Sequence, residues 1–228
     1  NSSIAVARPD GTVQLVQFPM GTTATVSYRS LLYLEQVSTA RGRLVKSWTG
    51  PSGISRYLEA DDKGRLIQSL KSFLTSHSLR TTEVFGRQVL LEDLIANILR
   101  DIREEKNRQF PDHVERVVVG RPIQFVGASR EDDNSRAVER LRDALGRAGF
   151  SDVEFEFEPV GAACYYESML DRDELILIGD FGGGTSDFSL LRVGPSVRRR
   201  GRRPDDLLGN EGVGLAGDAF DAKIVRHL

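Results

Sequence analysis

The spacing of apolar residues predicts several amphipathic helices. Between residues 91 and 106, apolar side chains recur every three or four positions with Glu, Asp and Arg between them, as in a helix that buries one face. A second run of this kind covers residues 135–148 and ends at Gly149, a residue typical of helix C-termini. Residues 52–75 have helical spacing in two pieces, interrupted at 61–64, and the second piece contains Lys71. A last helix is predicted over 218–228, with Phe220, Ile224, Val225 and Leu228 on one face.

Short apolar runs bounded by turn residues predict strands. Residues 4–7 and 12–16 flank Pro9-Asp10-Gly11 and should form a hairpin, with residues 30–34 as a third strand of the same small sheet. The β-branched run 117–119 is typical of a strand buried on both faces. Further strands are expected at 153–157, 175–178 and 188–193, with a short helix after Pro159. This alternation predicts an α/β fold with mixed sheets flanked by helices.

Composition narrows the class of protein. A chain of 228 residues with 39% apolar and 28% charged residues can form one large domain or two lobes around a core. The single cysteine, Cys164, cannot form an intrachain disulfide, and no apolar run approaches the ~18 residues of a membrane helix, so we expect a cytoplasmic protein. A net charge of −2 argues against nucleic acid as a partner, and we expect the arginines of 198–203 in an exposed hairpin loop.

A glycine-rich segment after a predicted strand has the chemistry of a phosphate site. Residues 178–187 read Ile-Gly-Asp-Phe-Gly-Gly-Gly-Thr-Ser-Asp and should form a hairpin turn. The N–H groups of Gly182, Gly183 and Gly184 can approach phosphate oxygens, Asp180 can hold the water shell of Mg²⁺, and Thr185 can donate to a phosphate oxygen. The pattern fits equally a tight turn that Asp180 caps. For Asp187 we favour a polar residue that flanks the turn.

Residues 180–185, Asp-Phe-Gly-Gly-Gly-Thr, resemble the second phosphate motif of the actin-like ATPases, most closely the DnaK-type chaperones of the heat shock protein 70 family. Three further segments are similar to motifs of that family and occur in its order: 69–74 around Lys71, 158–163 beginning at Glu158, and 215–221 containing Gly217. Order and spacing together are more specific than any one motif. The resemblance extends along the whole chain and covers roughly the first 60% of such an ATPase domain.

The resemblance implies an actin-like, ribonuclease H-like ATPase fold with ATP or ADP and Mg²⁺ as cofactors. It implies that Lys71 orients the attacking water, that Glu158 and Asp180 complete the water shell of Mg²⁺, and that Thr185 hydrogen-bonds the γ-phosphate. Gly182, Gly183, Gly184 and Gly217 would bind the nucleotide phosphates. A lysine and two carboxylates also suit phosphoryl transfer. The alternatives are an exposed helix lysine for Lys71 and a helix N-terminal carboxylate for Glu158.

The same resemblance predicts a first lobe over residues 1–159, with a small insertion at about 20–90, and the start of a second lobe at 160. Nucleotide would lie between the lobes, and the intact protein would be an ATP-driven chaperone whose partners are unfolded proteins or co-chaperones. Two alternatives share the superfold. One is an actin-like filament-forming ATPase, against which the lysine segment argues, and the other is a small-molecule kinase, for which no convincing catalytic aspartate is found.

Several positions depart from the family pattern. These are Ala216, Gly161, Thr75 and the segment Gly120-Arg121-Pro122, and they suggest a divergent bacterial branch. Asn1 resembles the last residue of the family's first phosphate loop, and the chain ends before the adenosine-contacting segment. We therefore expect this fragment to bind ATP weakly and to hydrolyse it slowly, whereas the intact protein would be an ATPase.

Overall fold

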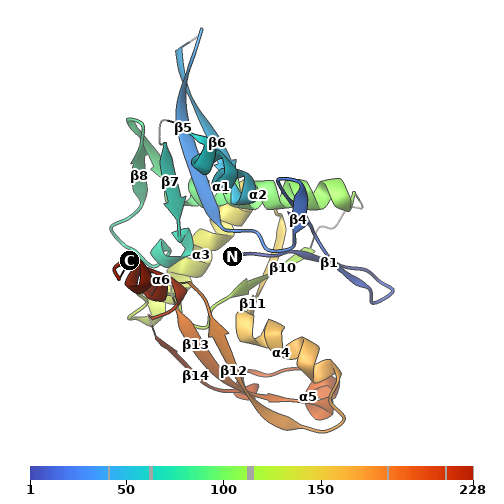
Figure 1. Ribbon diagram of the computed structural model, residues 1–228. Coiled ribbons are helices and arrows are strands. Elements are labelled where there is room, and N and C mark those ends of the chain that lie inside the picture. The colour runs from blue at the N-terminus through green and yellow to red at the C-terminus, as the bar shows by residue number, and fades with distance from the viewer. Residues whose placement is uncertain (41, 62–63, 112–115, 184, 214, 228) are drawn as a thin grey trace. The chain divides into compact units, whose positions relative to one another are not determined.

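A computed structural model describes residues 1–228 except 41, 62–63, 112–115, 184, 214 and 228 (Figure 1). The chain divides into two compact units. Unit 1 comprises Asn1–Val117 and Ser129–Val153, and unit 2 comprises Val118–Ala128 and Glu154–Leu228. The predicted assignment of residues 1–159 and 160–228 to two lobes of an ATPase domain stays a prediction.

Unit 1 begins with two antiparallel hairpins, β1 (Ala5–Ala7) with β2 (Val13–Leu15), and β3 (Phe18–Met20) with β4 (Thr23–Thr25). In the first turn, the carboxylate of Asp10 accepts hydrogen bonds from the backbone N–H and the hydroxyl of Thr12, at 2.9 and 2.7 Å. The predicted hairpin is confirmed. An Asp that hydrogen-bonds the backbone two residues ahead is a common way to close such a turn.

The next sheet of unit 1 has the strand order β6 (Gly42–Thr49), β5 (Leu31–Thr39), β7 (Arg65–Gln68), with α1 (Gly50–Glu59) between β6 and β7 in the chain. Both pairings are antiparallel. The strand predicted at 30–34 exists, but its assignment to the sheet of the first hairpin was wrong, because β5 pairs with β6 and β7 instead. The start of β5 is buried and belongs to the core of the unit.

The second half of the predicted helix at 52–75 is also different in the structure. Residues Arg65–Gln68 form β7, which pairs with β5 from Leu34↔Arg65 to Leu31↔Gln68. Ser69 then adopts a left-handed backbone conformation, φ 58°, and a short 3-10 helix, η1 (Leu70–Phe73), follows. The apolar spacing of this segment fits a helix, but long-range pairing with β5 outweighs that local preference.

The predicted long helices of unit 1 are confirmed. After the hairpin of β8 (Thr81–Val84) and β9 (Arg87–Leu90) comes α2 (Leu91–Gln109), and α3 (Glu131–Arg147) packs against it. The helix α2 buries Leu91, Leu94, Ile98 and Ile102, which are the positions of the predicted apolar face. As predicted, Gly149 follows α3, and its φ of 94° is one that glycine adopts without strain.

The strands β10 (Arg116–Arg121) and β11 (Asp152–Phe157) pair with each other, and both cross the boundary between the units. The strand predicted at 117–119 is therefore present. Its expected burial on both faces was wrong, since exposed and half-buried residues alternate along β10 and Val118 is 60% exposed. Alternate side chains of a strand point to opposite faces, and one of these faces is open to solvent here.

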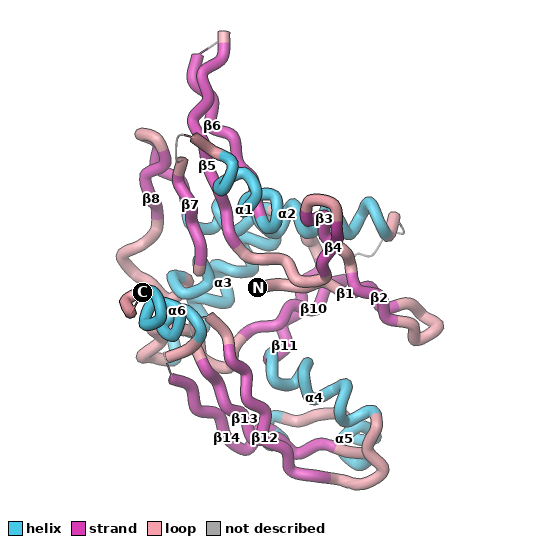
Figure 2. The backbone as a smooth tube through the Cα atoms, viewed as in Figure 1, coloured by secondary structure: helices cyan, strands magenta, loops and turns pink. Residues whose placement is uncertain are grey.

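Unit 2 is built on the antiparallel sheet β12 (Glu174–Phe181), β13 (Ser186–Val193), β14 (Leu207–Val213), which Figure 2 shows as neighbouring strands. The helix α4 (Glu158–Ser168) packs on β12 and β13. Val160 and Ala163 of α4 form a buried cluster with Leu191 and Val193 of β13. The chain ends with α6 (Gly217–Val225), the predicted helix, on which Phe220, Ile224 and Val225 are exposed; Leu228 lies outside the described residues.

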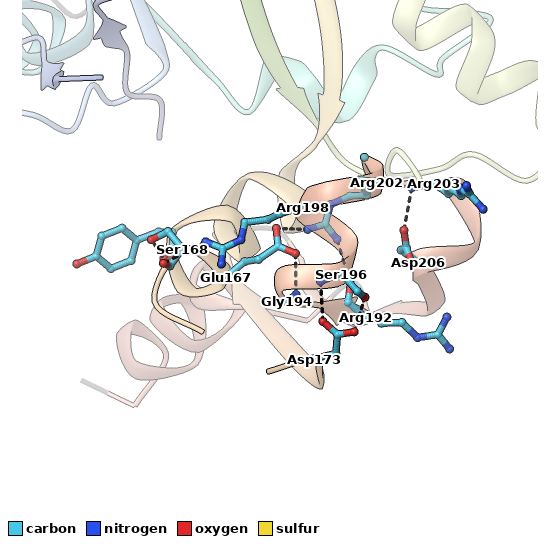
Figure 3. A network of polar contacts seen from close by, with 12 residues as sticks. Glu167, Ser168, Asp173, Arg192, Gly194, Ser196, Arg198, Arg202, Arg203 and Asp206 are labelled. Atoms are coloured by element: carbon cyan, nitrogen blue, oxygen red, sulfur yellow. Dashed lines mark hydrogen bonds and ion pairs between the residues drawn. The ribbon is translucent and has the colours of Figure 1, made fainter. Parts of the chain in front are cut away.

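The arginine-rich segment joins the antiparallel neighbours β13 and β14, and most of its arginines are exposed, as predicted; the helical structure within it was not predicted. It consists of the short helix α5 (Pro195–Arg200) and a turn that leads into η2 (Pro204–Asp206). Figure 3 shows the surrounding network of polar contacts. The guanidinium of Arg202 donates to the buried carboxylate of Glu167 at 2.7 Å, and that of Arg200 pairs with Asp206, whose side chain is 1% exposed. Buried carboxylates thus hold the segment in place.

The described helices and strands confirm an α/β protein. The registers that the structure gives are antiparallel, so the mixed sheets stay a prediction. Among the residues that the structure describes, none of the helices combines the length and the apolar character needed to cross a bilayer.

Candidate functional site

Unit 2 contains a pocket lined by three carboxylates, which we call the carboxylate pocket. Its walls come from the loop after β10, the start of α4 and the three-stranded sheet. The lining residues are Pro122, Ile123, Glu158, Pro159, Ile178, Asp180, Asp187, Ser189 and Asn210. Two of the predicted site residues, Glu158 and Asp180, are therefore brought together within one unit.

Glu158 reaches the pocket from the first position of α4. The strand β11 ends at Phe157, and Pro159 at the start of the helix has a fixed φ suited to the first turn. The positive end of the helix dipole favours a carboxylate at this position. A Cβ atom on Gly120 would lie 3.2 Å from Cγ of Glu158, so the glycine that departs from the family pattern leaves room for the glutamate side chain.

Asp180 and Asp187 lie directly opposite each other on β12 and β13. Cβ atoms of such cross-strand partners are about 4.5–5.5 Å apart, and two like charges at this separation destabilise the sheet. A cation between the aspartates and Glu158 would offset that repulsion. From the sequence, Asp187 was interpreted as a polar residue that flanks the turn. In the structure it lines the same pocket as Asp180.

The carboxylate pocket suits a hydrated ion better than a dehydrated one. Within the described part of the chain, no three His, Cys, Asp or Glu residues lie close enough to hold a metal ion directly. Mg²⁺ loses its waters reluctantly and is usually held by one or two carboxylates together with several waters. The carboxylate oxygens that line the pocket are donors of the kind that this mode of binding uses.

Ser189 and Asn210 form a polar wall that sequence reasoning missed. The hydroxyl of Ser189 donates to Oδ1 of Asn210 at 2.8 Å, and Ser189 is buried. Ser189 follows Asp187 by two positions on β13, and therefore faces the same side of the sheet. Asn210 is the register partner of Ser189 on β14. No strand was predicted at residues 207–213, so the sequence offered no register in which Asn210 would meet Ser189.

The glycine turn adjoins the start of α6. The N–H of Gly182 donates to the carbonyl of Thr185 at 2.9 Å, and the N–H of Gly217 donates to the carbonyl of Gly182 at 3.1 Å. Because the turn itself uses the N–H of Gly182, this group does not face a phosphate in the described conformation, contrary to expectation. Gly183 is exposed, Thr185 is half-buried and does not line the carboxylate pocket, and Gly184 lies outside the described residues.

Arg121 lies beside the carboxylate pocket and is partly shielded from water. Its guanidinium stacks 4.3 Å from the ring centre of Phe157, the residue before Glu158. Burial lowers the pKa of Arg121, while the carboxylate of Glu156 acts in the opposite direction. A stacked guanidinium retains a positive charge close to the point where α4 begins.

Lys71 lies in unit 1, on η1, with an exposed side chain. The buried residues Leu70 and Leu74 flank it and hold the short helix against the unit. The predicted meeting of Lys71 with Glu158 and Asp180 joins residues of two units and stays a prediction.

Comparison with known proteins adds independent evidence. A sequence model of the family described as Hsp70 protein matches residues 65–228. The chain is 31% identical over 146 residues to a chaperone protein DnaK of Prochlorococcus marinus (strain MIT 9515), an alignment that covers 64% of the chain and 21% of the relative. It is 32% identical over 144 residues to the chloroplastic stromal 70 kDa heat shock-related protein of Spinacia oleracea, covering 63% and 22%. The chain thus spans about a fifth of the length of these relatives.

Proposed function

The chain belongs to the Hsp70 family, as part of its nucleotide-binding domain, and we propose that the carboxylate pocket of unit 2 holds the hydrated Mg²⁺ of a bound ATP or ADP. The observation behind this proposal is that Glu158, Asp180 and Asp187 line one pocket. Mg²⁺ in such a place supplies charge neutralisation for the nucleotide phosphates. For the whole domain we propose the actin-like ATPase fold of the family.

In the proposed reaction of the intact protein, water attacks the γ-phosphate of ATP. Glu158 and Asp180 orient the water molecules around the metal ion, Thr185 donates to the γ-phosphate, and Lys71 holds the attacking water. Gly183 and Gly217 would lie on the phosphate side of the site, with Gly182 as the base of the turn; Gly184, to which the resemblance gives the same role, lies outside the described residues. Most of the catalysis in phosphoryl transfer is positioning and charge stabilisation, which fixed side chains of this kind supply.

We further propose that hydrolysis drives a chaperone that binds unfolded proteins or co-chaperones through the intact protein. The matched relative of Prochlorococcus marinus is named a chaperone protein, which supports this role over a filament-forming ATPase or a small-molecule kinase. A cytoplasmic location and a bacterial origin stay predictions, since another matched relative is a chloroplast protein.

The proposal is tested on the intact protein with Glu158→Gln and Asp180→Asn, which remove charge and retain size. Calorimetry should show ADP affinity in the presence of Mg²⁺ reduced by about 10- to 100-fold, the usual loss when a residue that orients the groups around a metal ion is removed. Lys71→Ala should lower the turnover of ATP and leave the protein folded.

Glu211→Gln is the matched control. Glu211 is exposed on β14, next to Asn210, and points to the opposite face of the sheet. Its substitution should leave ADP affinity unchanged. If Glu158→Gln and Asp180→Asn bind ADP and Mg²⁺ as the wild type does, the carboxylate pocket is not the metal site.

A further inference from the structure

A nearly buried arginine on α3 of unit 1 binds the segment that follows Lys71. The side chain of Arg140 is 10% exposed. Its Nη1 donates to the carbonyls of Phe73, Leu74 and Ser76 at 3.2, 3.3 and 3.2 Å, and its Nη2 donates to the carbonyl of Leu79 at 3.1 Å. One guanidinium therefore contacts four backbone carbonyls within seven residues.

Arg140 is itself held in place by α2. Its Nε lies 2.5 Å from Oε1 of Glu92, whose side chain is 11% exposed. A guanidinium presents five N–H donors in a rigid planar fork, so fixing one edge with a carboxylate also fixes the direction of the other donors. The residues 73–79 are thereby attached to the layer that α2 and α3 form.

The other side of Lys71 is fixed as well. Gln68, three residues before it, pairs with Leu31 in the sheet, and Ser69 turns the chain into η1 with a positive φ. Positive φ at a residue other than glycine is uncommon and persists where the surrounding structure holds it. Lys71 thus sits on a single helical turn with an anchored segment on each side.

We propose that Arg140 is a positioning residue for Lys71. By binding the carbonyls of residues 73–79, it holds the C-terminal end of η1 and so sets the place from which the lysine side chain extends. The inference rests on the role proposed above for Lys71 in orienting the attacking water. It adds a residue that lies 69 positions away in the chain and to which the sequence assigns no function.

The experiment compares Arg140→Lys with Arg147→Lys in the intact protein. Lysine keeps the charge but offers a compact ammonium that cannot span four carbonyls and Glu92. Arg147 lies two turns further along α3 and pairs with Asp93, the neighbour of Glu92 on α2, at 2.7 Å. The two arginines therefore connect the same pair of helices. Among the described hydrogen bonds, Arg140 donates to residues 73–79, whereas Arg147 donates to Asp143 and Asp93.

For Arg140→Lys we expect kcat for ATP hydrolysis to fall by about 10- to 100-fold, since a displacement of about 1 Å can cost a factor of this size. The KM for ATP should change by less than about twofold, and hydrogen exchange should accelerate at residues 72–79 but not in the middle of α2. Arg147→Lys should leave all three measurements near the wild-type values. The variant Glu92→Gln removes the countercharge of Arg140 but keeps an amide oxygen that can accept from its Nε, and the donors to residues 73–79 stay in place, so kcat and exchange should change in the same direction by a smaller factor.

The possible outcomes separate this inference from the proposed function. If Lys71→Ala lowers turnover whereas Arg140→Lys and Glu92→Gln do not, Arg140 has no positioning role, and the role of Lys71 stands. If exchange at 72–79 accelerates in Arg140→Lys without any loss of kcat, Arg140 is only structural. Unchanged turnover in Lys71→Ala would remove both the proposed role of the lysine and the positioning role of Arg140.

Discussion

Replacement of Arg202 by alanine should destabilise unit 2 strongly. The carboxylate of Glu167 on α4 has two recorded partners, the guanidinium of Arg202 at 2.7 Å and the backbone N–H of Gly194 at 2.8 Å (Figure 3). Glu167 and Arg202 are 7% and 19% exposed, so water screens this pair little. In Arg202→Ala the carboxylate stays buried and keeps the N–H of Gly194 as its recorded partner.

The expected cost is about 3–5 kcal/mol, the usual penalty for leaving one charge of a buried pair without its partner. This is a large part of the roughly 5–15 kcal/mol that stabilises a typical domain. Arg172→Ala is the matched control, because Arg172 pairs with Glu174 at 3.0 Å in the same unit but is 79% exposed. An exposed pair is worth about 0–1 kcal/mol, so the control should lose little stability.

Native-state hydrogen exchange of the 228-residue chain is the suitable assay, because the single tryptophan, Trp48, lies in unit 1. Amides of α4 should exchange more than about 100-fold faster in Arg202→Ala, the factor that a loss of 3 kcal/mol implies. Amides of α2 in unit 1 provide an internal reference and should keep their rates. If the α4 amides exchange in Arg202→Ala within a few-fold of their rates in Arg172→Ala, the Glu167–Arg202 pair is not a main stabiliser of the unit.

Two further predictions concern pH and backbone strain. The ion pair with Arg200 lowers the pKa of Asp206 from 3.8 to about 2, so its stabilising effect is complete above about pH 4 and is lost as the pH falls towards 2. In Asp206→Asn the free energy of unfolding should therefore fall less between pH 4 and pH 2 than in the wild type, whereas Asp205→Asn should behave as the wild type does. Unfolding followed by circular dichroism measures this difference. At Ser69, φ 58° costs a side chain with a Cβ roughly 1–2 kcal/mol; Ser69→Gly removes this cost, offset by the roughly 0.5–1 kcal/mol of extra chain entropy that glycine loses, so it should be at least as stable as the wild type. Ser69→Val should be less stable, because a β-branched side chain is the most restricted at positive φ. Urea unfolding monitored by Trp48 fluorescence measures this, and equal stability of the two variants would contradict it.

The elements that were predicted correctly are those whose own sequence determines them. The apolar faces of α2 and α3 repeat at helical spacing over four or more turns, and Asp10 closes the first hairpin by a local contact. The predictions that failed depended on distant partners. Residues 65–68 form a strand because β5 is available to pair with them. The helical turns within the arginine segment were not predicted either, since Glu167, 35 residues from Arg202 in the chain, helps to hold them.

The candidate site shows the same division. Glu158 and Asp180 were identified from motifs in the sequence, and the structure places both in one pocket. Asp187 and Asn210 were missed because they enter the pocket through the register of β12, β13 and β14. A sequence motif does not reveal the register of paired strands. The engagement of the Gly182 N–H within its own turn likewise follows from the backbone conformation and not from residue type.

The polypeptide passes between the two units after Val117, after Ala128 and again after Val153. Neither unit is therefore encoded by one continuous stretch of the gene. A truncation that ends at residue 153 would keep residues 118–128 and delete the rest of the unit to which they belong. Exchange of one unit alone between related genes needs a breakpoint at each of these three crossings, so this architecture favours the inheritance of both units as one block.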